Sequence, residues 1–412
     1  MALIVQKYGG TSMGTPERIL NVARRVKRWH DHGHKVVVVV SAMSGETNRL
    51  LSLAKAITST PNPRELDQMV STGEQVTISM LAMALNSIGV EARSYTGRQV
   101  GIKTDSAFTK ARIESIDTDV MTNDLDAGRV IVVAGFQGFD AEGNITTLGR
   151  GGSDTSGVAL AAALKADECQ IYTDVDGVYT CDPRIVPQAQ KLPRVTYEEM
   201  LEMAALGAKV LHPRSVELAM AWAVPLQVLS SFDAGIGSDL AGTHVVREED
   251  IVEKHIVNGV TYARNEAKIT LVAVPDKPGI AASIFAPLGD AGVNVDMIVQ
   301  NISSDGKTTD MTFTVPRGDV ALTQSVLDKM PDLHAGDIRV DAHVSKISVI
   351  GIGMSSHTGV AKTMFQTLAD RSINIQAITT SEIKISVLIS EDYTELAVRA
   401  LHTAFGLDKE SV

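Results

Sequence analysis

The feature that most constrains this chain is a glycine-rich loop, residues 9–14, between an apolar run and an amphipathic helix near the amino terminus. Residues 2–5 predict a strand, Thr15 is a good N-cap, and Pro16 suits the first helical position. Backbone N–H groups at a helix start bind anions, and Lys7 adds a positive charge. The loop matches neither of the two common phosphate-binding glycine motifs. It therefore predicts an anion site of another kind, with a plain tight turn as the alternative.

A second glycine-rich loop, residues 149–157, favours the anion site. It follows a short strand-like run at residues 145–148 and opens an Ala- and Leu-rich helix that ends at about residue 165. Two such loops, each at the start of a helix, could hold one phosphate between them.

The composition is that of an ordinary globular protein, with 44% hydrophobic and 21% charged residues. A chain of 412 residues predicts two or three domains, because single hydrophobic cores stop growing beyond ~250 to 300 residues. The net charge of -11 argues against nucleic acid or an anionic membrane as a partner. Two cysteines without C-x-x-C spacing, no signal-peptide pattern and no membrane-spanning apolar run predict a cytoplasmic protein.

Strand and helix patterns alternate through the first part of the chain, which predicts a mostly parallel sheet with helices on both faces. The run at residues 35–40 is followed by Ser41 and Thr47, at the edge of the sheet where doubly wound folds bind ligands. A helix cap is the alternative role for Thr47. The helical region 64–86 is interrupted near Glu74. That residue is either an exposed first-turn carboxylate or a buried acid that awaits a cation.

Three further expectations concern the same domain. Residues 112–124 have a helical pattern, which predicts one helix there. The Asp-rich segment after the strand at residues 170–173 lacks the full set of calcium-loop acids, so we exclude calcium. A linker rich in Gly and Asp, residues 233–243, closes the domain, which we place at residues 1–245.

The remainder of the chain is an internal repeat with a period of about 80 residues. Residues 268–274 match residues 346–352, and residues 292–295 match residues 372–375. Each unit reads strand, helix, strand, strand, helix, which is the opening of a ferredoxin-like fold.

We place the first repeat at residues 264–344 and the second at residues 345–412. The second repeat has no final strand of its own. An unassigned strand-like run at about residues 253–263 precedes the first repeat, which is already complete. We therefore predict that this run supplies the missing strand and that the second domain is discontinuous in sequence.

The two glycine loops, together with the segment from Thr173 to Arg184, resemble the aspartate kinases, and the repeats resemble the ACT domains of these enzymes. The resemblance covers nearly the whole chain. It implies a three-layer αβα, carbamate-kinase-like domain with a mostly parallel sheet, followed by two ferredoxin-like ACT domains. It also implies transfer of the γ-phosphoryl group of ATP to the side-chain carboxylate of L-aspartate, which gives 4-phospho-L-aspartate.

The resemblance assigns roles to individual residues. In these assignments Arg150 holds the α-carboxylate of aspartate bidentately, and Glu74 holds its ammonium group. Mg²⁺ would arrive as Mg-ATP, held mainly by the phosphates, so we name no metal ligand. The residues with an implied catalytic role are Lys7, Asp154 and Lys209. Those implied to bind ATP are Lys7, Gly9, Gly10, Ser12, Thr173, Asp174, Tyr179, Arg184 and Lys209. Those implied to bind aspartate are Ser41, Thr47, Glu74, Arg150, Gly152 and Ser153.

The first repeat is expected to bind lysine, threonine or both as feedback inhibitors. Its glycine turn suits an amino-acid carboxylate, and Asp276 is available to an ammonium group. The equivalent turn in the second repeat, residues 353–359, lacks this acid, so we do not expect it to bind an effector alone. The alternative is that both repeats are only dimerisation surfaces. The expected effector residues are Asp276, Gly279, Ile280, Ala281, Asn294 and Gln300, with Asn374 and Ile375 from the second repeat.

An aspartate kinase would catalyse the first step towards lysine, threonine and methionine. Its expected partners are L-aspartate, ATP, the inhibitors, further copies of the chain joined through the ACT domains, and a separate shorter regulatory chain of the same sequence. Two other functions stay open: a kinase of the same fold for glutamate or acetylglutamate, and a catalytically silent amino-acid sensor. An acylated amine would not require Glu74, and the presence of Lys7 and both glycine loops argues against the silent sensor.

Overall fold

The computed structural model describes residues 1–206, 210–232, 242–251, 256–302, 306–330 and 337–409. These residues form two compact units. The first consists of Met1–Val178 and Lys191–Val252, and the second of Tyr179–Gln190 and Glu253–Val412.

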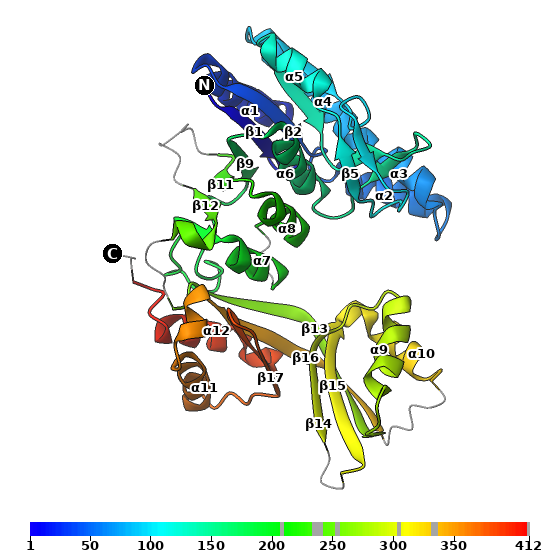
Figure 1. Cartoon of the computed structure of the whole chain (residues 1–412), viewed down its shortest axis with the longest axis vertical. Helices are drawn as coiled ribbons and strands as arrows, with labels where there is room; N and C mark the ends of the chain where they lie inside the picture. Colours follow the sequence, from blue (N-terminus) through cyan, green and yellow to red (C-terminus); the bar gives the residue numbers. More distant parts are fainter. Residues whose placement is uncertain (207–209, 233–241, 252–255, 303–305, 331–336, 410–412) are drawn as a thin grey trace. The chain divides into compact units, whose positions relative to one another are not determined.

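An eight-stranded sheet forms the centre of the first unit (Figure 1), in the order β10-β12-β11-β9-β1-β2-β6-β3. Neighbouring strands are parallel except β11 and β12, as the alternating pattern predicts. In β2 all five valines are buried, because helices cover both faces of the sheet. The strands are β1 (Leu3–Tyr8), β2 (Lys35–Val40), β3 (Ala92–Tyr95), β6 (Val130–Ala134), β9 (Glu168–Thr173), β10 (Arg194–Thr196), β11 (Leu226–Ser230) and β12 (Thr243–Val246).

Helices α1 and α4 share one hydrophobic core with Ile4, Val36 and Val38 on one face of the sheet. Helix α6 contacts β1, β2 and β9 on the opposite face. Thr15 caps α1 by accepting from the Arg18 N–H, and Pro16 is its first residue, as predicted. The helices of this unit are α1 (Pro16–Asp31), α2 (Glu46–Ile57), α3 (Pro63–Val70), α4 (Thr72–Ser87), α5 (Asp119–Asp126), α6 (Gly152–Leu164), α7 (Tyr197–Ala205), α8 (Pro213–Trp222) and the 3-10 turn η2 (Glu248–Asp250).

The prediction of one helix over residues 112–124 is wrong. Its first part is a strand, β5 (Ile113–Ile116), and only α5 is helical. Strand β5 pairs with β4 (Ile102–Thr104) in a small second sheet of order β5-β4-β7-β8, which also contains β7 (Gln137–Phe139) and β8 (Ile145–Thr147). Pairing with a strand from elsewhere in the chain outweighs the local helical pattern. The linker expected at residues 233–243 lies largely outside the described residues, and β12 begins at its end.

The second unit contains a six-stranded sheet in the order β14-β15-β13-β16-β18-β17. Its elements are β13 (Gly259–Pro275), α9 (Ile280–Asp290), β14 (Asp296–Ile302), β15 (Thr308–Pro316), η3 (Arg317–Asp319), α10 (Val320–Leu327), β16 (Asp337–Ile350), η4 (Ile352–Ser356), α11 (Val360–Asp370), β17 (Ala377–Thr380), β18 (Lys384–Ser390), η5 (Glu391–Tyr393) and α12 (Thr394–Ala404).

The two long strands β13 and β16 each take part in both repeats. Residues 259–263 of β13 pair with residues 346–350 of β16, which open the second repeat. Residues 266–272 pair with residues 337–344, which close the first repeat, and the register is irregular between the two stretches.

The second unit also includes a short segment, Tyr179–Gln190, that follows β9 in sequence by only a few residues. Cys181, Ile185 and Val186 belong to the hydrophobic core of the second repeat. The Thr180 carbonyl accepts from the Val260 N–H at 2.8 Å, and its hydroxyl lies 2.9 Å from His402 Nε2 on α12. This segment is therefore an integral part of the second repeat.

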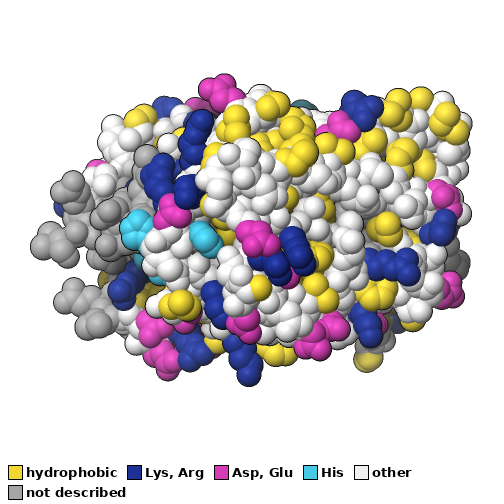
Figure 2. Space-filling model, turned by 90° about the horizontal axis from the view of Figure 1, so that it is seen from above, with side chains coloured by type: hydrophobic (Ala, Val, Ile, Leu, Met, Phe, Trp, Pro, Cys, Tyr) yellow, Lys and Arg dark blue, Asp and Glu magenta, His cyan; other side chains and the backbone are white. Residues whose placement is uncertain are grey.

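On the face shown in Figure 2, Lys and Arg side chains lie among Asp and Glu side chains rather than in one basic patch. Among the described residues, no helix combines the length and the apolar character that a bilayer-spanning segment needs.

Candidate active site

A cavity of about 370 Å³ lies in the first unit, at the carboxyl ends of β1 and β2 and at the start of α6. It brings together nine residues that the sequence analysis singled out, although they come from four separate stretches of the chain. These are Lys7, Gly10, Ser41, Thr47, Glu74, Arg150, Gly152, Ser153 and Asp154.

Lys7 lies near the end of β1 and is only 8% exposed. Its Nζ atom is 2.6 Å from Asp154 Oδ1, in the first turn of α6. The ion pair places a cation beside the start of a helix, where backbone N–H groups also favour an anion. This part of the cavity suits a phosphoryl group.

The first glycine loop packs tightly against the segment that follows β2. A Cβ atom on Gly10 would lie 3.0 Å from the Ala42 carbonyl oxygen, so a side chain does not fit there without movement. Gly10 also lines the cavity together with Lys7, so the main chain of the loop borders the space for a ligand.

Glu74 lies in the first turn of α4 and is 3% exposed, so it is the buried acid and not the exposed carboxylate of our two alternatives. Its Oε1 atom accepts from the Ala42 N–H at 3.0 Å, and Oε2 has no hydrogen-bond partner among the described residues. Burial raises the pKa of Glu74 to about 7. A buried carboxylate oxygen without a partner is costly, and a ligand cation would satisfy it.

The second glycine loop contributes Arg150 to the cavity lining. Arg150 is exposed, and its guanidinium makes no hydrogen bond or ion pair with the described residues. Gly151 must be glycine: its φ is +68°, and a Cβ atom would lie 2.2 Å from Cγ of His212. The loop therefore places on the cavity lining a guanidinium that no other described residue engages.

One residue that contacts the first glycine loop was missed by the sequence analysis. The hydroxyl groups of Ser12 and Ser231 are hydrogen-bonded, and the Ser231 N–H donates to the Thr173 carbonyl at 2.8 Å. Ser231 follows β11 directly. The rule that led us to Ser41, that polar residues at the carboxyl end of a parallel strand face a ligand, would have identified it.

Of the remaining predicted ATP residues, those that the structure describes lie outside the cavity lining. Thr173 ends β9 and donates its hydroxyl hydrogen to Asp174 at 3.1 Å. Tyr179 and Arg184 belong to the second unit, where the Arg184 guanidinium donates to Asp182 at 2.7 Å. Lys209 lies outside the described residues.

Comparison with known proteins identifies the family of this site. A model of the amino acid kinase family matches residues 2–230, which is more than half of the chain. The chain belongs to the amino acid kinase family. Two ACT-domain models match residues 268–332 and 347–405 of this amino acid kinase. The family and the fold class that the sequence resemblance implied are therefore confirmed.

Relatives of this amino acid kinase carry consistent names. It is 61% identical to aspartate kinase Ask_LysC of Stutzerimonas stutzeri over 99% of this chain and 98% of the relative. It is 52% identical to an aspartokinase of Helicobacter pylori over 99% and 100% of the two chains. Its structure resembles that of E. coli aspartokinase III in complex with aspartate and ADP, with a TM-score of 0.82 and 28% identity over 98% and 99% of the two chains.

In this amino acid kinase the predicted effector residues lie on the repeats, and most are exposed. The side chains of Asp276, Ala281, Asn294, Gln300 and Asn374 are exposed, as is Gly279, whereas Ile375 is half-buried and Ile280 is buried at the start of α9. Lys268 of the first repeat donates to Gln376, and the equivalent Lys346 of the second repeat pairs with Asp296. These reciprocal contacts join the two repeats beside Asn294 and Asn374.

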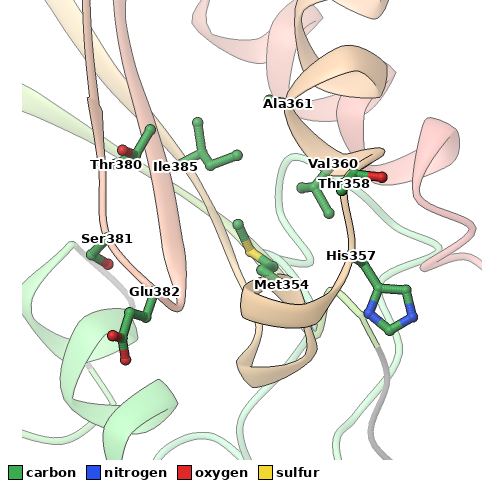
Figure 3. A pocket seen from close by; sticks show the side chains of 9 residues that line it. All are labelled: Met354, His357, Thr358, Val360, Ala361, Thr380, Ser381, Glu382 and Ile385. Atoms are coloured by element: carbon green, nitrogen blue, oxygen red, sulfur yellow. The ribbon is translucent and has the colours of Figure 1, made fainter.

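A cavity of about 500 Å³ lies at the turn of the second repeat (Figure 3). Met354, Val360 and Ile385 provide an apolar part of its lining, while His357 and Glu382 are its ionisable residues. This is the turn that we expected not to bind an effector alone. The cavity therefore makes the second repeat an alternative location for one.

The described residues contain no group of three or more His, Cys, Asp or Glu side chains that could hold a metal ion. Asp154 is engaged by Lys7.

Proposed function

We propose that this amino acid kinase is an aspartate kinase, which transfers the γ-phosphoryl group of ATP to the side-chain carboxylate of L-aspartate. The observation that carries the proposal is the cavity that Glu74, Arg150 and Lys7 line together. Among the described residues, one oxygen of the buried Glu74 carboxylate and the Arg150 guanidinium have no partner. Full-length relatives named aspartokinase support the proposal, as does the fold shared with an aspartokinase that binds aspartate and ADP.

The chemistry requires little beyond binding and charge stabilisation. A carboxylate nucleophile is ionised at neutral pH and needs no general base. Lys7 and the main-chain amides of the first glycine loop stabilise the charge on the transferring phosphoryl group, and Asp154 holds the Lys7 ammonium in place. Arg150 and Glu74 hold the two charged groups on the α-carbon. Mg²⁺, when bound with ATP, offsets part of the phosphate charge.

A hydroxamate-trapping assay tests the proposal. The parent protein with Mg-ATP and hydroxylamine should form a hydroxamate with L-aspartate, and much less with glutamate or acetylglutamate. If activity on glutamate or acetylglutamate equals or exceeds activity on aspartate, the protein is a kinase for that other acid. A folded protein without activity on all three acceptors would favour the silent sensor.

The raised pKa of Glu74 predicts how aspartate binding depends on pH. The carboxyl must be ionised to hold the substrate ammonium, and burial raises its pKa to about 7. Below this pH the free enzyme carries a neutral Glu74, so the aspartate KM should rise as pH falls, by nearly tenfold for each unit below about pH 6. The KM for ATP should change much less over the same range. An aspartate KM that stays constant between pH 8 and 5.5 would contradict the role of Glu74.

We also propose that the repeats bind lysine, threonine or both as inhibitors, mainly at the first repeat. A related aspartokinase III has been crystallised with lysine and aspartate, which supports this reading. Asp276→Ala and Gln300→Ala should each raise the inhibitor concentration for half inhibition at least tenfold and leave uninhibited turnover near that of the parent.

Glu382→Ala, in the second-repeat cavity, is the discriminating variant for the effector site. If it abolishes inhibition while Asp276→Ala and Gln300→Ala remain sensitive, the effector binds at the second repeat instead. If all three variants stay sensitive, the site lies elsewhere.

Several further expectations belong to the same proposal. We regard the second ACT domain as discontinuous, with residues 259–263 as its last strand; their pairing with residues 346–350 supports this division. We also keep four predictions made from the sequence. The enzyme stands at the start of lysine, threonine and methionine synthesis, it is cytoplasmic, it forms oligomers through the ACT domains, and it has a separate shorter regulatory chain.

A further inference from the structure

The hairpin that leads into the second glycine loop is attached to the helices that lead to Glu74. In this hairpin Gln137 of β7 and Thr147 of β8 are register partners, and both side chains are buried. The Gln137 Nε2 atom donates to the carbonyl of Ser71 at 2.9 Å, and Ser71 lies between α3 and α4. Thr147 is bound by Asp67 on α3. Two adjacent positions of the hairpin thus contact the same helical segment.

Asp67 makes the stronger of these contacts. Its side chain is fully buried, at 0% exposure, in the middle of α3. Its Oδ2 atom accepts from the Thr147 N–H and the Thr109 N–H, each at 2.8 Å, and its Oδ1 atom accepts from the Thr147 hydroxyl at 2.7 Å. A buried carboxylate with three hydrogen bonds is a rigid connection, because any displacement leaves an unsatisfied charge.

The spacing along the chain links these contacts to the substrate residues. Glu74 follows Ser71 by three residues, and Arg150 follows Thr147 by three residues. Three residues span roughly 10 Å at most, so neither side chain can move far once Ser71 and Thr147 are fixed. Arg214 of α8 adds to this by donating to the carbonyls of Leu148 and Ala111, each at 2.8 Å.

We propose that Asp67, assisted by the Gln137 to Ser71 hydrogen bond, is a positioning residue that sets the separation between Glu74 and Arg150. This inference rests on the proposed function, because it concerns the two side chains that hold the α-amino and α-carboxylate groups. The separation fixes where the α-carbon lies relative to Lys7. Aspartate and glutamate differ by one methylene group between the α-carbon and the reacting carboxylate. A fixed α-carbon therefore places only one of the two carboxylates correctly at the phosphoryl group.

The test is Asp67→Asn in the full-length protein. The asparagine carbonyl can still accept from both N–H groups, and its amide can donate to the Thr147 hydroxyl, so the fold should persist while the charged contact is lost. We expect the aspartate KM to rise about tenfold or more with the ATP KM little changed, and the kcat/KM preference for aspartate over glutamate to fall about tenfold. Thr147→Val, which removes only the hydroxyl contact, should give a smaller change in the same direction.

The matched control is Asp124→Asn. Asp124 is also a buried carboxylate of the first unit, but its partners are Tyr95, Arg93 and Arg129 at the far edge of the sheet. The Asp124→Asn substitution should lower the melting temperature without changing the aspartate KM. A parent that forms no aspartyl hydroxamate would refute the proposed function. An active parent whose Asp67→Asn and Thr147→Val variants keep the parent KM and acceptor preference would overturn the positioning role. If Asp67→Asn does not fold, Thr147→Val and Gln137→Leu decide the question by the same measurements.

Discussion

Lys7→Ala is expected to lower kcat by about 10³-fold. The Lys7 ammonium lies at the carboxyl end of β1, beside the first glycine loop and the start of α6, where the transferring phosphoryl group is proposed to bind. Removing one such charge from a site that is poorly accessible to water typically costs several kcal/mol of transition-state stabilisation. Steady-state kinetics at saturating aspartate and Mg-ATP would measure the loss directly.

Two further variants separate this effect from damage to the fold. Lys7→Ala leaves the nearly buried Asp154 without its 2.6 Å cation partner, which should lower the melting temperature. Adding Asp154→Asn should restore much of the melting temperature but not the activity. Lys35→Ala is the control. Lys35 also pairs with an aspartate, Asp126, but it is the first residue of β2, whereas the cavity lies beyond the last residue of that strand. A folded Lys7→Ala variant with turnover near that of the parent would disprove the assignment.

Arg150→Lys should raise the aspartate KM by about 10- to 100-fold and leave the ATP KM almost unchanged. Lysine keeps the charge but loses the planar fork that binds a carboxylate with two parallel hydrogen bonds. A hydrogen bond to a charged group contributes roughly 1.5–3 kcal/mol, and 1.4 kcal/mol corresponds to a factor of about ten.

The control for Arg150→Lys is Arg98→Lys. Arg98 is an exposed arginine of the same unit that donates to the Gly143 carbonyl and does not line the cavity. Its kinetic constants should equal those of the parent. If Arg150→Lys changes the KM values for aspartate and ATP equally, Arg150 does not act on the amino acid alone.

Local sequence pattern was sufficient wherever the structure depends on neighbouring residues. The strand, glycine loop and helix at the amino terminus follow from the apolar run, the Thr15 cap and Pro16, which act within a few residues of one another. The polar residues after β2 line the cavity, as expected for the edge of the sheet where the carboxyl ends of parallel strands lie. The same pattern failed at residues 113–116, where pairing with β4 produces a strand.

What the sequence alone determined was therefore the order of the elements, the two glycine loops and the repeat. The tertiary structure decided which of these come together and which side chains lose contact with water. Three hydrogen bonds illustrate this, because each joins residues that lie 32 to 219 positions apart in the sequence. They link Ala42 to the buried Glu74, Ser12 to Ser231, and Thr147 to Asp67. By contrast, the pairing of residues 259–263 of β13 with residues 346–350 of β16 supports a strand that the sequence analysis had already assigned to the second repeat. Hydrogen bonds and burial of this kind depend on which strands become neighbours, and no local pattern encodes that choice.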